Sequence, residues 1–317
     1  MSDRFPLLRL PQDALKRVLR SMEPLDLILF SFYSNRNKSL VASINMRSKV
    51  KVMVSNDFTI HAKIGEQRFK FLFYSHEVKN DPLPIKMGTP EIVYLIHFDG
   101  KKYEGTMYVV PRFMDIPSWL SHIKTIFNCS NVFQLRFFLG VGNFDLDSLR
   151  DSMLQENIHE LVVSTSNSDE YNPKIMKTFG NMNHLYLDTD GYENGKPPGK
   201  VLIQNFSEFQ VGSYNIYETT MTLDDILMLN SKEVHFAFSE LTEKDVNRFL
   251  KLWMRGNSKL ECFSLSFAHE MDVDEDTVLK GIKFQETPGG FDVIRRDGTR
   301  GTISFDDDYM EFLVWHD

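Results

Sequence analysis

The residues that could do chemistry in this sequence come close to several known arrangements without completing any of them. Residues 140–142 (Gly-Val-Gly) begin like a dinucleotide-binding turn, but Asp145 stands where the third glycine is required. Residues 195–200 (Gly-Lys-Pro-Pro-Gly-Lys) resemble a phosphate loop, yet they are one residue short between the glycines, and Val201 replaces the magnesium-binding Ser or Thr. The two prolines also remove backbone N–H donors that would hold a phosphate. We therefore predict no cofactor.

Patterns for metal binding and for nucleophilic catalysis are likewise incomplete. His159 and His269 are each followed by Glu, but neither has the second His that a zinc-protease helix needs four positions on. The acidic runs 272–276 and 306–308 lack the spacing and the glycine of a calcium loop, so we interpret them as solvated loops. No Gly-x-Ser-x-Gly occurs. We predict no catalytic and no metal-binding residues, although an enzyme with an unrecognised site stays open as an alternative.

Composition narrows the class of protein. The chain has 317 residues, of which 42% are hydrophobic and 13% aromatic, as in a folded protein. Its net charge of −8 argues against a protein that binds phosphate backbones, and no stretch of 18 apolar residues could span a membrane. We see no signal peptide, and two cysteines allow no disulfide framework beyond one bridge. We expect an intracellular protein, cytoplasmic or nuclear, with free thiols and neither nucleic acid nor membrane as partner.

The N-terminal residues predict three short helices. Leu15, Val18, Leu19 and Met22 are spaced as on one face of an amphipathic helix, which Pro24 ends. Pro24 also suits the first turn of a second helix, and we expect a third over 38–44. So small a domain cannot bury all of its large apolar side chains, and an exposed apolar patch usually marks a partner site.

The rest of the chain predicts a sheet followed by repeats. Alternating residues between 48 and 112 predict a small antiparallel sheet, followed by a helix over 116–127. Six short apolar runs then begin 26, 24, 24, 25 and 29 positions apart, with helix-like segments between them. This period is typical of leucine-rich repeats, although the repeat signature is degenerate and an ordinary α/β domain stays open. From about residue 280 we expect strands again, with a hairpin turned at Asp297-Gly298 that caps the stack.

The N-terminal pattern resembles an F-box. The matching residues are Leu10-Pro11, Leu15, Val18-Leu19, Met22, Pro24, Asp26-Leu27-Ile28, Ser31, Ser34 and Arg36. Residues 5–11 and 38–41 are similar to the large nematode family of F-box proteins, in which an F-box-associated domain follows. Phe32, Tyr33 and Asn35 depart from the commonest choices, which leaves the F-box assignment intact but bears on adaptor preference.

The resemblance implies the substrate-recognition subunit of an SCF-type ubiquitin ligase, without catalysis of its own. The F-box would bind a Skp-type adaptor, and through it a cullin, while the C-terminal region would hold an unknown target protein. A repeat-type protein-binding scaffold that acts without ubiquitin transfer is the alternative. We expect adaptor binding from ten residues that divide between the interface and the core of the helices: Leu10, Pro11, Leu15, Val18, Leu19, Met22, Pro24, Leu27, Ile28 and Phe30.

The expected fold is α+β or α/β in three domains. These are an F-box over 1–47, an antiparallel sheet with a helix over 48–128, and a leucine-rich-repeat-like F-box-associated domain with a C-terminal β hairpin over 129–317. The loops near 165–172, 188–200 and 212–220 are the expected rim for binding the target.

Overall fold

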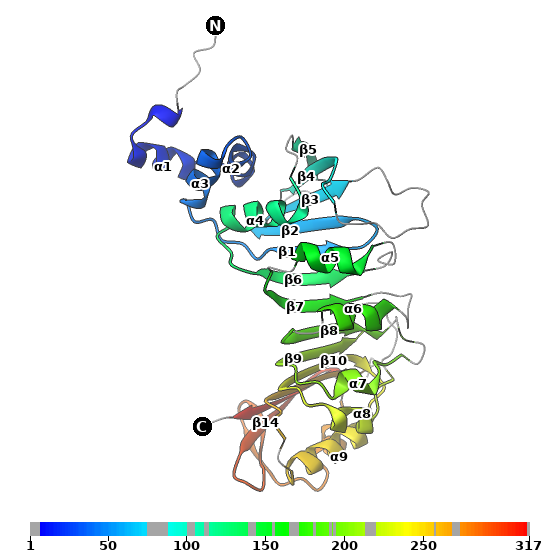
Figure 1. Cartoon of the computed structure of the whole chain (residues 1–317). Helices are drawn as coiled ribbons and strands as arrows, with labels where there is room; N and C mark the ends of the chain where they lie inside the picture. The colour runs from blue at the N-terminus through cyan, green and yellow to red at the C-terminus, as the bar shows by residue number, and fades with distance from the viewer. Residues whose placement is uncertain are drawn as a thin grey trace. The chain divides into compact units, whose positions relative to one another are not determined.

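The structure, a computed structural model, has two compact units (Figure 1). One unit comprises Met1–Arg136 and Gly140–His159, and the other comprises Phe137–Leu139 and Glu160–Asp317. The predicted F-box and sheet segments thus share one unit, and the predicted three-domain division stays a prediction. The structure describes residues 7–74, 88–99, 105–110, 114–138, 144–153, 156–164, 171–179, 182–189, 192, 195–212, 220–256, 258–267 and 273–315.

Short helices open the first unit, as predicted. They are the 3-10 turn η1 (Leu7–Arg9), α1 (Gln12–Arg20), α2 (Pro24–Ser31) and α3 (Asn35–Ala42). Pro24 occupies the first turn of α2, where its missing N–H costs no hydrogen bond. The third helix begins before its predicted start at residue 38, because the Ser34 side chain accepts a hydrogen bond from Asn37 N at 3.1 Å and caps α3.

A sheet completes the first unit, and its strands run in the order β6-β1-β2-β3-β4-β5, in which the pairs from β1 to β5 are antiparallel. The five N-terminal strands lie where the alternating pattern predicts them. Trp119 of α4 lies fully buried against Phe73 of β3, with ring centroids 5.5 Å apart, so α4 covers one face of this sheet. The elements are β1 (Lys51–Val54), β2 (Phe58–Ile64), β3 (Gln67–Tyr74), β4 (Ile92–Phe98), β5 (Thr106–Val110), α4 (Ile116–Ile126), β6 (Val132–Phe137) and α5 (Leu146–Met153).

Five parallel strands with intervening helices build the second unit. The strands β7 to β11 lie side by side in chain order, and each described pair among them is parallel. Thr222 and Thr242 close capping boxes with Asp225 and Asp245 at the starts of α8 and α9. The elements are β7 (Ile158–Val163), α6 (Tyr171–Phe179), β8 (His184–Asp188), α7 (Gly199–Leu202), β9 (Glu208–Gly212), α8 (Leu223–Met228), β10 (Glu233–Ser239), α9 (Glu243–Trp253) and β11 (Cys262–Phe267).

The chain is thus a mixed α/β protein with a helical N-terminus and a large β component. The parallel strand–helix alternation agrees with the predicted order of elements. It does not by itself establish leucine-rich repeats, because ordinary α/β sheets share this topology and the asparagine or cysteine expected at the ladder position of the repeat is mostly missing. The leucine-rich-repeat assignment therefore stays a prediction.

Antiparallel strands close the C-terminal end of the second unit. Asp297-Gly298 lies between β13 and β14 as predicted, and Gly298 has a φ of +94° that suits glycine. The acidic run 306–308 is exposed and ends in the turn between β14 and β15. The elements are α10 (Glu275–Leu279), β12 (Phe284–Thr287), β13 (Gly290–Ile294), β14 (Arg300–Asp306) and β15 (Tyr309–Trp315). Among the described residues, no helix has the length and apolar character needed to cross a bilayer.

Candidate functional site

The first helix presents two different faces. Pro11 precedes α1, and its carbonyl accepts the first backbone hydrogen bond of the helix, from Leu15 N at 2.9 Å. Leu15 and Leu19 point inward and are 4% and 0% exposed, whereas Val18 is 36% exposed. The apolar positions of α1 therefore include two buried residues and one exposed residue, because the apolar face of the helix is wider than the part of it that packs inside the unit.

Polar contacts hold the other helices beside this face. Asn37 Nδ2 donates to Phe30 O at 3.2 Å, which ties α3 to the end of α2. Arg36 donates to the Leu8 carbonyl at 3.4 Å and so reaches η1. At the end of α2, Ser31 Oγ lies 2.9 Å from His122 Nε2 of α4. The N-terminal helices are therefore connected to α4 of the same unit through α2, while α1 keeps an exposed side.

The ten residues predicted to bind an adaptor divide by exposure. The structure does not test their binding, so their role stays a prediction, but the buried ones are held within this chain's own core. Pro11 and Val18 are exposed, Leu10, Met22, Pro24 and Phe30 are half-buried, and Leu15, Leu19, Leu27 and Ile28 are buried. Sequence reasoning missed Leu8, which is 37% exposed, although its place two positions before Leu10 could have suggested it.

The segment that resembles a phosphate loop has a structural role where the structure describes it. Lys196 of the phosphate-loop-like segment donates to both carboxylate oxygens of Asp225, at 3.0 and 3.3 Å. Burial alone would raise the pKa of Asp225, but hydrogen bonds from Thr222 and Lys196 lower it, so the carboxylate stays charged and paired with the lysine. Residues 140–142 and His269, and most of the expected target-binding rim, lie outside the described residues.

No metal centre forms in the described part of the chain. Across the ranges given above, His, Cys, Asp and Glu side chains nowhere gather in threes as metal ligands do. Two thiols, of Cys129 and Cys262, are free in the structure. The arrangement that remains is a small helical domain with an outward apolar side, followed by a larger α/β body. Exposed apolar residues on a small helical domain suit the binding of a protein partner.

Comparison with known families identifies this class of protein. Residues 7–49 match the F-box domain family, and residues 198–265 match the F-box associated family. The first match covers η1 to α3, and the second covers α7 to β11, ending within that last strand. The chain therefore has an N-terminal region that matches the F-box domain and a C-terminal region that matches the F-box-associated domain.

One curated relative extends the similarity to nearly the whole chain. The F-box associated domain-containing protein sdz-33 of Caenorhabditis elegans is 23% identical over 325 residues, which cover 98% of each chain. The resemblance to the nematode-type F-box proteins is thereby confirmed. Among solved structures, a probable ornithine cyclodeaminase from Bordetella pertussis Tohama I aligns with 74% of this chain and 68% of its own. Its identity is 9% and its TM-score 0.17, so no relationship of fold follows.

Proposed function

We propose that this chain is the substrate-recognition subunit of an SCF-type ubiquitin ligase, acting inside the cell. In this proposal the F-box binds a Skp-type adaptor, which connects the chain to a cullin, and the F-box-associated region holds the target protein. Ubiquitin transfer itself is done by partner enzymes, and the chain contributes no catalytic residue. The match of residues 7–49 to the F-box domain is the observation that carries the proposal.

The exposed side of the helical domain supports an adaptor interface. Val18 and Pro11 are exposed on α1 and at its start, and Leu8 lies on the neighbouring turn. Burying one such apolar side chain at a partner contributes about 1.5–3 kcal/mol, and a few central residues usually provide most of an interface's affinity. The leucine-rich-repeat-like character of the C-terminal region belongs to the same proposal, since stacked repeats offer extended binding surfaces.

The test is co-purification of the full chain with a Skp-type adaptor and a cullin. Pro11→Ala combined with Val18→Asp places a charge on the exposed side of α1, and we expect at least a roughly tenfold loss of adaptor binding. Leu19→Asp would be a poor probe, because Leu19 is fully buried and the substitution would unfold the domain. Leu252→Asp on α9, where Leu252 is 42% exposed, is the matched control that keeps adaptor binding.

The outcomes separate the proposal from its alternative. Undiminished adaptor binding by the Pro11→Ala, Val18→Asp variant would overturn the assignment of the interface to this side of α1. Recovery of the adaptor without any cullin would favour a protein-binding scaffold that acts without ubiquitin transfer. Recovery of both, together with loss of both in the variant, supports the ligase subunit.

A further inference from the structure

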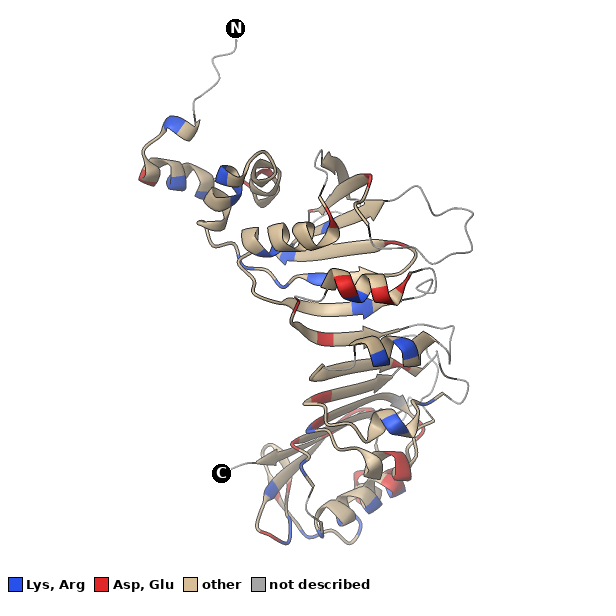
Figure 2. Cartoon of the chain, in the orientation of Figure 1, with Lys and Arg blue, Asp and Glu red and all other residues tan. Residues whose placement is uncertain are grey.

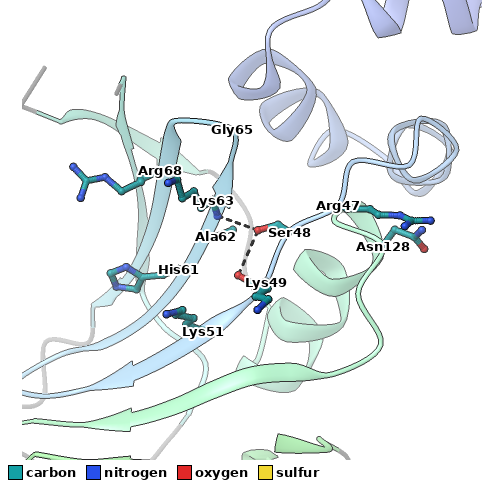
Figure 3. Close-up of a pocket in the computed structure, with 10 residues that line it drawn as sticks. All are labelled: Arg47, Ser48, Lys49, Lys51, His61, Ala62, Lys63, Gly65, Arg68 and Asn128. Atoms are coloured by element: carbon teal, nitrogen blue, oxygen red, sulfur yellow. Dashed lines mark hydrogen bonds between the residues drawn. The ribbon is translucent and has the colours of Figure 1, made fainter. Parts of the chain in front are cut away.

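A cavity of about 780 Å³ in the first unit is lined by positive charge (Figure 3). It lies where the linker after α3 meets strands β1, β2 and β3, and Lys63 N donates to Ser48 Oγ at 2.9 Å to hold the linker against β2. None of the lining residues is Asp or Glu. The whole chain has a net charge of −8, so a pocket whose only charged lining residues are cations contrasts with the overall composition. Figure 2 marks the positions of Lys and Arg along the chain in blue and those of Asp and Glu in red. The cationic lining residues are Arg47, Lys49, Lys51, Lys63 and Arg68.

The strand register places like charges opposite one another. Lys63 of β2 pairs directly with Arg68 of β3, and His61 lies between Lys51 of β1 and Lys70 of β3. Residues directly opposite in an antiparallel pair project from the same face, and like charges there destabilise the sheet. A bound anion would relieve this repulsion, so the arrangement favours a negatively charged ligand.

Aromatic rings, rather than carboxylates, hold two of the cations in place. Lys49 Nζ lies 3.9 Å from the centroid of Phe133, and Arg68 Cζ lies 5.5 Å from that of Phe98. A ring face attracts a cation without cancelling its charge. Lys63 has a carboxylate neighbour, Glu66 at 3.9 Å, but both side chains are largely exposed, and such a surface pair contributes little.

The surroundings of His61 also disfavour a further positive charge. Burial, followed by the charges of Lys70, Lys51 and Arg136, lowers the pKa of His61 to about 4. The imidazole is therefore neutral at physiological pH, because burial and, after it, the neighbouring cations disfavour its charged form.

The geometry favours a peptide over other anions. A single oxyanion would leave most of the cavity empty and would reach only some of the cations, which come from the linker and three strands. Single-stranded nucleic acid needs exposed aromatic faces on which bases stack, but here Lys49 and Arg68 lie over the rings of Phe133 and Phe98. An extended chain with several acidic side chains satisfies both the volume and the spread of charge.

We propose that this basic pocket binds an acidic segment of polypeptide, with its carboxylate or phosphoserine groups against Lys49, Lys63 and Arg68. The inference rests on the proposed function, because the segment would belong to the target protein. It adds a second contact to the one made by the F-box-associated region, gives the chemical class of the target segment bound there, and places that contact in the unit that also carries the F-box.

The experiment measures binding of short fluorescein-labelled peptides to the full chain by anisotropy at low ionic strength. One probe alternates Glu with Gly, one alternates phosphoserine with Gly, and a Gln–Gly peptide is the uncharged reference. We expect the acidic probes to bind and the affinity to fall as salt is added. In Lys63→Glu, Arg68→Glu we expect a roughly tenfold or greater loss. Lys244→Glu, Arg248→Glu on the exposed side of α9 makes the same change in net charge away from the pocket.

Each outcome decides the proposal. Loss of binding in the pocket variant alone supports it, and the better of the two acidic probes identifies carboxylate or phosphate as the preferred group. Equal losses in both variants, no binding of either acidic probe, or tighter binding of a single-stranded oligonucleotide that the pocket variant abolishes would overturn it. Lys63→Gln, Arg68→Gln answers the same question if the charge reversal impairs folding. Adaptor co-purification by the pocket variant, measured in parallel, separates this proposal from the ligase assignment.

Discussion

Phe32 lies flat against His122, with ring centroids 4.5 Å apart and an angle of 8° between the ring planes. Phe32 directly follows α2 of the F-box, and His122 belongs to α4, which covers the antiparallel sheet. Trp119 of α4 contacts the same phenylalanine, at 5.1 Å between centroids. The departure of Phe32 from the commonest F-box residue therefore has an internal explanation. Its ring fixes the F-box to the following domain instead of facing a partner.

Phe32→Ala should destabilise the first unit. Phe32 is 9% exposed and packs against two rings of α4, and truncating a buried phenylalanine typically costs about 3–5 kcal/mol. Urea unfolding followed by tryptophan fluorescence measures the loss, and substitution of Trp253 and Trp315 by Phe in both proteins confines the signal to the buried Trp119. Tyr33→Ala is the matched control, because Tyr33 is 81% exposed and its removal should change the free energy of unfolding by less than about 0.5 kcal/mol. Equal effects of the two substitutions would contradict the packing described here.

Acidification should weaken the fold through His61. Its pKa is about 4 in the folded chain, against an ordinary value of 6.5. Between these values the unfolded chain binds a proton that the folded chain does not, so the free energy of unfolding falls as the pH drops from 6.5 toward 4. Below that range the contribution is constant. At pH 5 this effect lowers the free energy of unfolding by about 2 kcal/mol relative to its value well above pH 6.5.

His61→Gln isolates this contribution. The hydrogen-bonding amide can replace the 2.9 Å contact of His61 Nε2 with Thr59 Oγ1, but it does not titrate. Urea unfolding near neutral pH and at about pH 5 should show a smaller decrease for the variant than for the unaltered chain. The same decrease in both would mean that other groups carry the acid sensitivity.

The two thiols should react slowly in the native protein. Burial is the largest cause that raises the pKa of Cys129 and of Cys262 to about 11, and for Cys129 it outweighs the nearby charge of Lys124. Only the thiolate is alkylated, so iodoacetamide at about pH 8 should label both roughly a hundredfold more slowly than in urea. Mass spectrometry of timed samples provides the rates. Fast labelling of Cys262, which is 8% exposed, would show that β11 opens.

The helices and strands that the sequence predicts correctly are those whose signals lie within the element itself. Strand β2 follows from strict alternation, and α8 and α9 from Thr222 and Thr242, whose capping boxes need no distant partner. The start of α3 was missed because Ser34 as its cap went unnoticed, and β15 because the alternation over Tyr309–Trp315 was not recognised as a strand. Both elements could have been predicted, because the signal for each lies in its own stretch of sequence.

The sites depend on contacts that a sequence pattern does not contain. The periodicity that places Leu15, Val18 and Leu19 on one stripe cannot say which of them faces inward, since that depends on the neighbouring elements. The basic pocket was missed for a similar reason. Its cations are scattered between residues 47 and 68 with no run of like charge, and only the antiparallel register brings Lys63 opposite Arg68.

Gly212→Val should destabilise the second unit, because β9 and β10 approach closely at this glycine. A Cβ atom added to Gly212 would lie 2.5 Å from the Cβ of Ala237, and that methyl group cannot rotate away. The strands must then separate, and overpacking of this kind typically costs about 1–3 kcal/mol. Thermal unfolding measures the loss, and Gly289→Ala is the control, since nothing lies within 4 Å of the corresponding atom there. A variant at position 212 as stable as the control would show that the two strands pack more loosely than described.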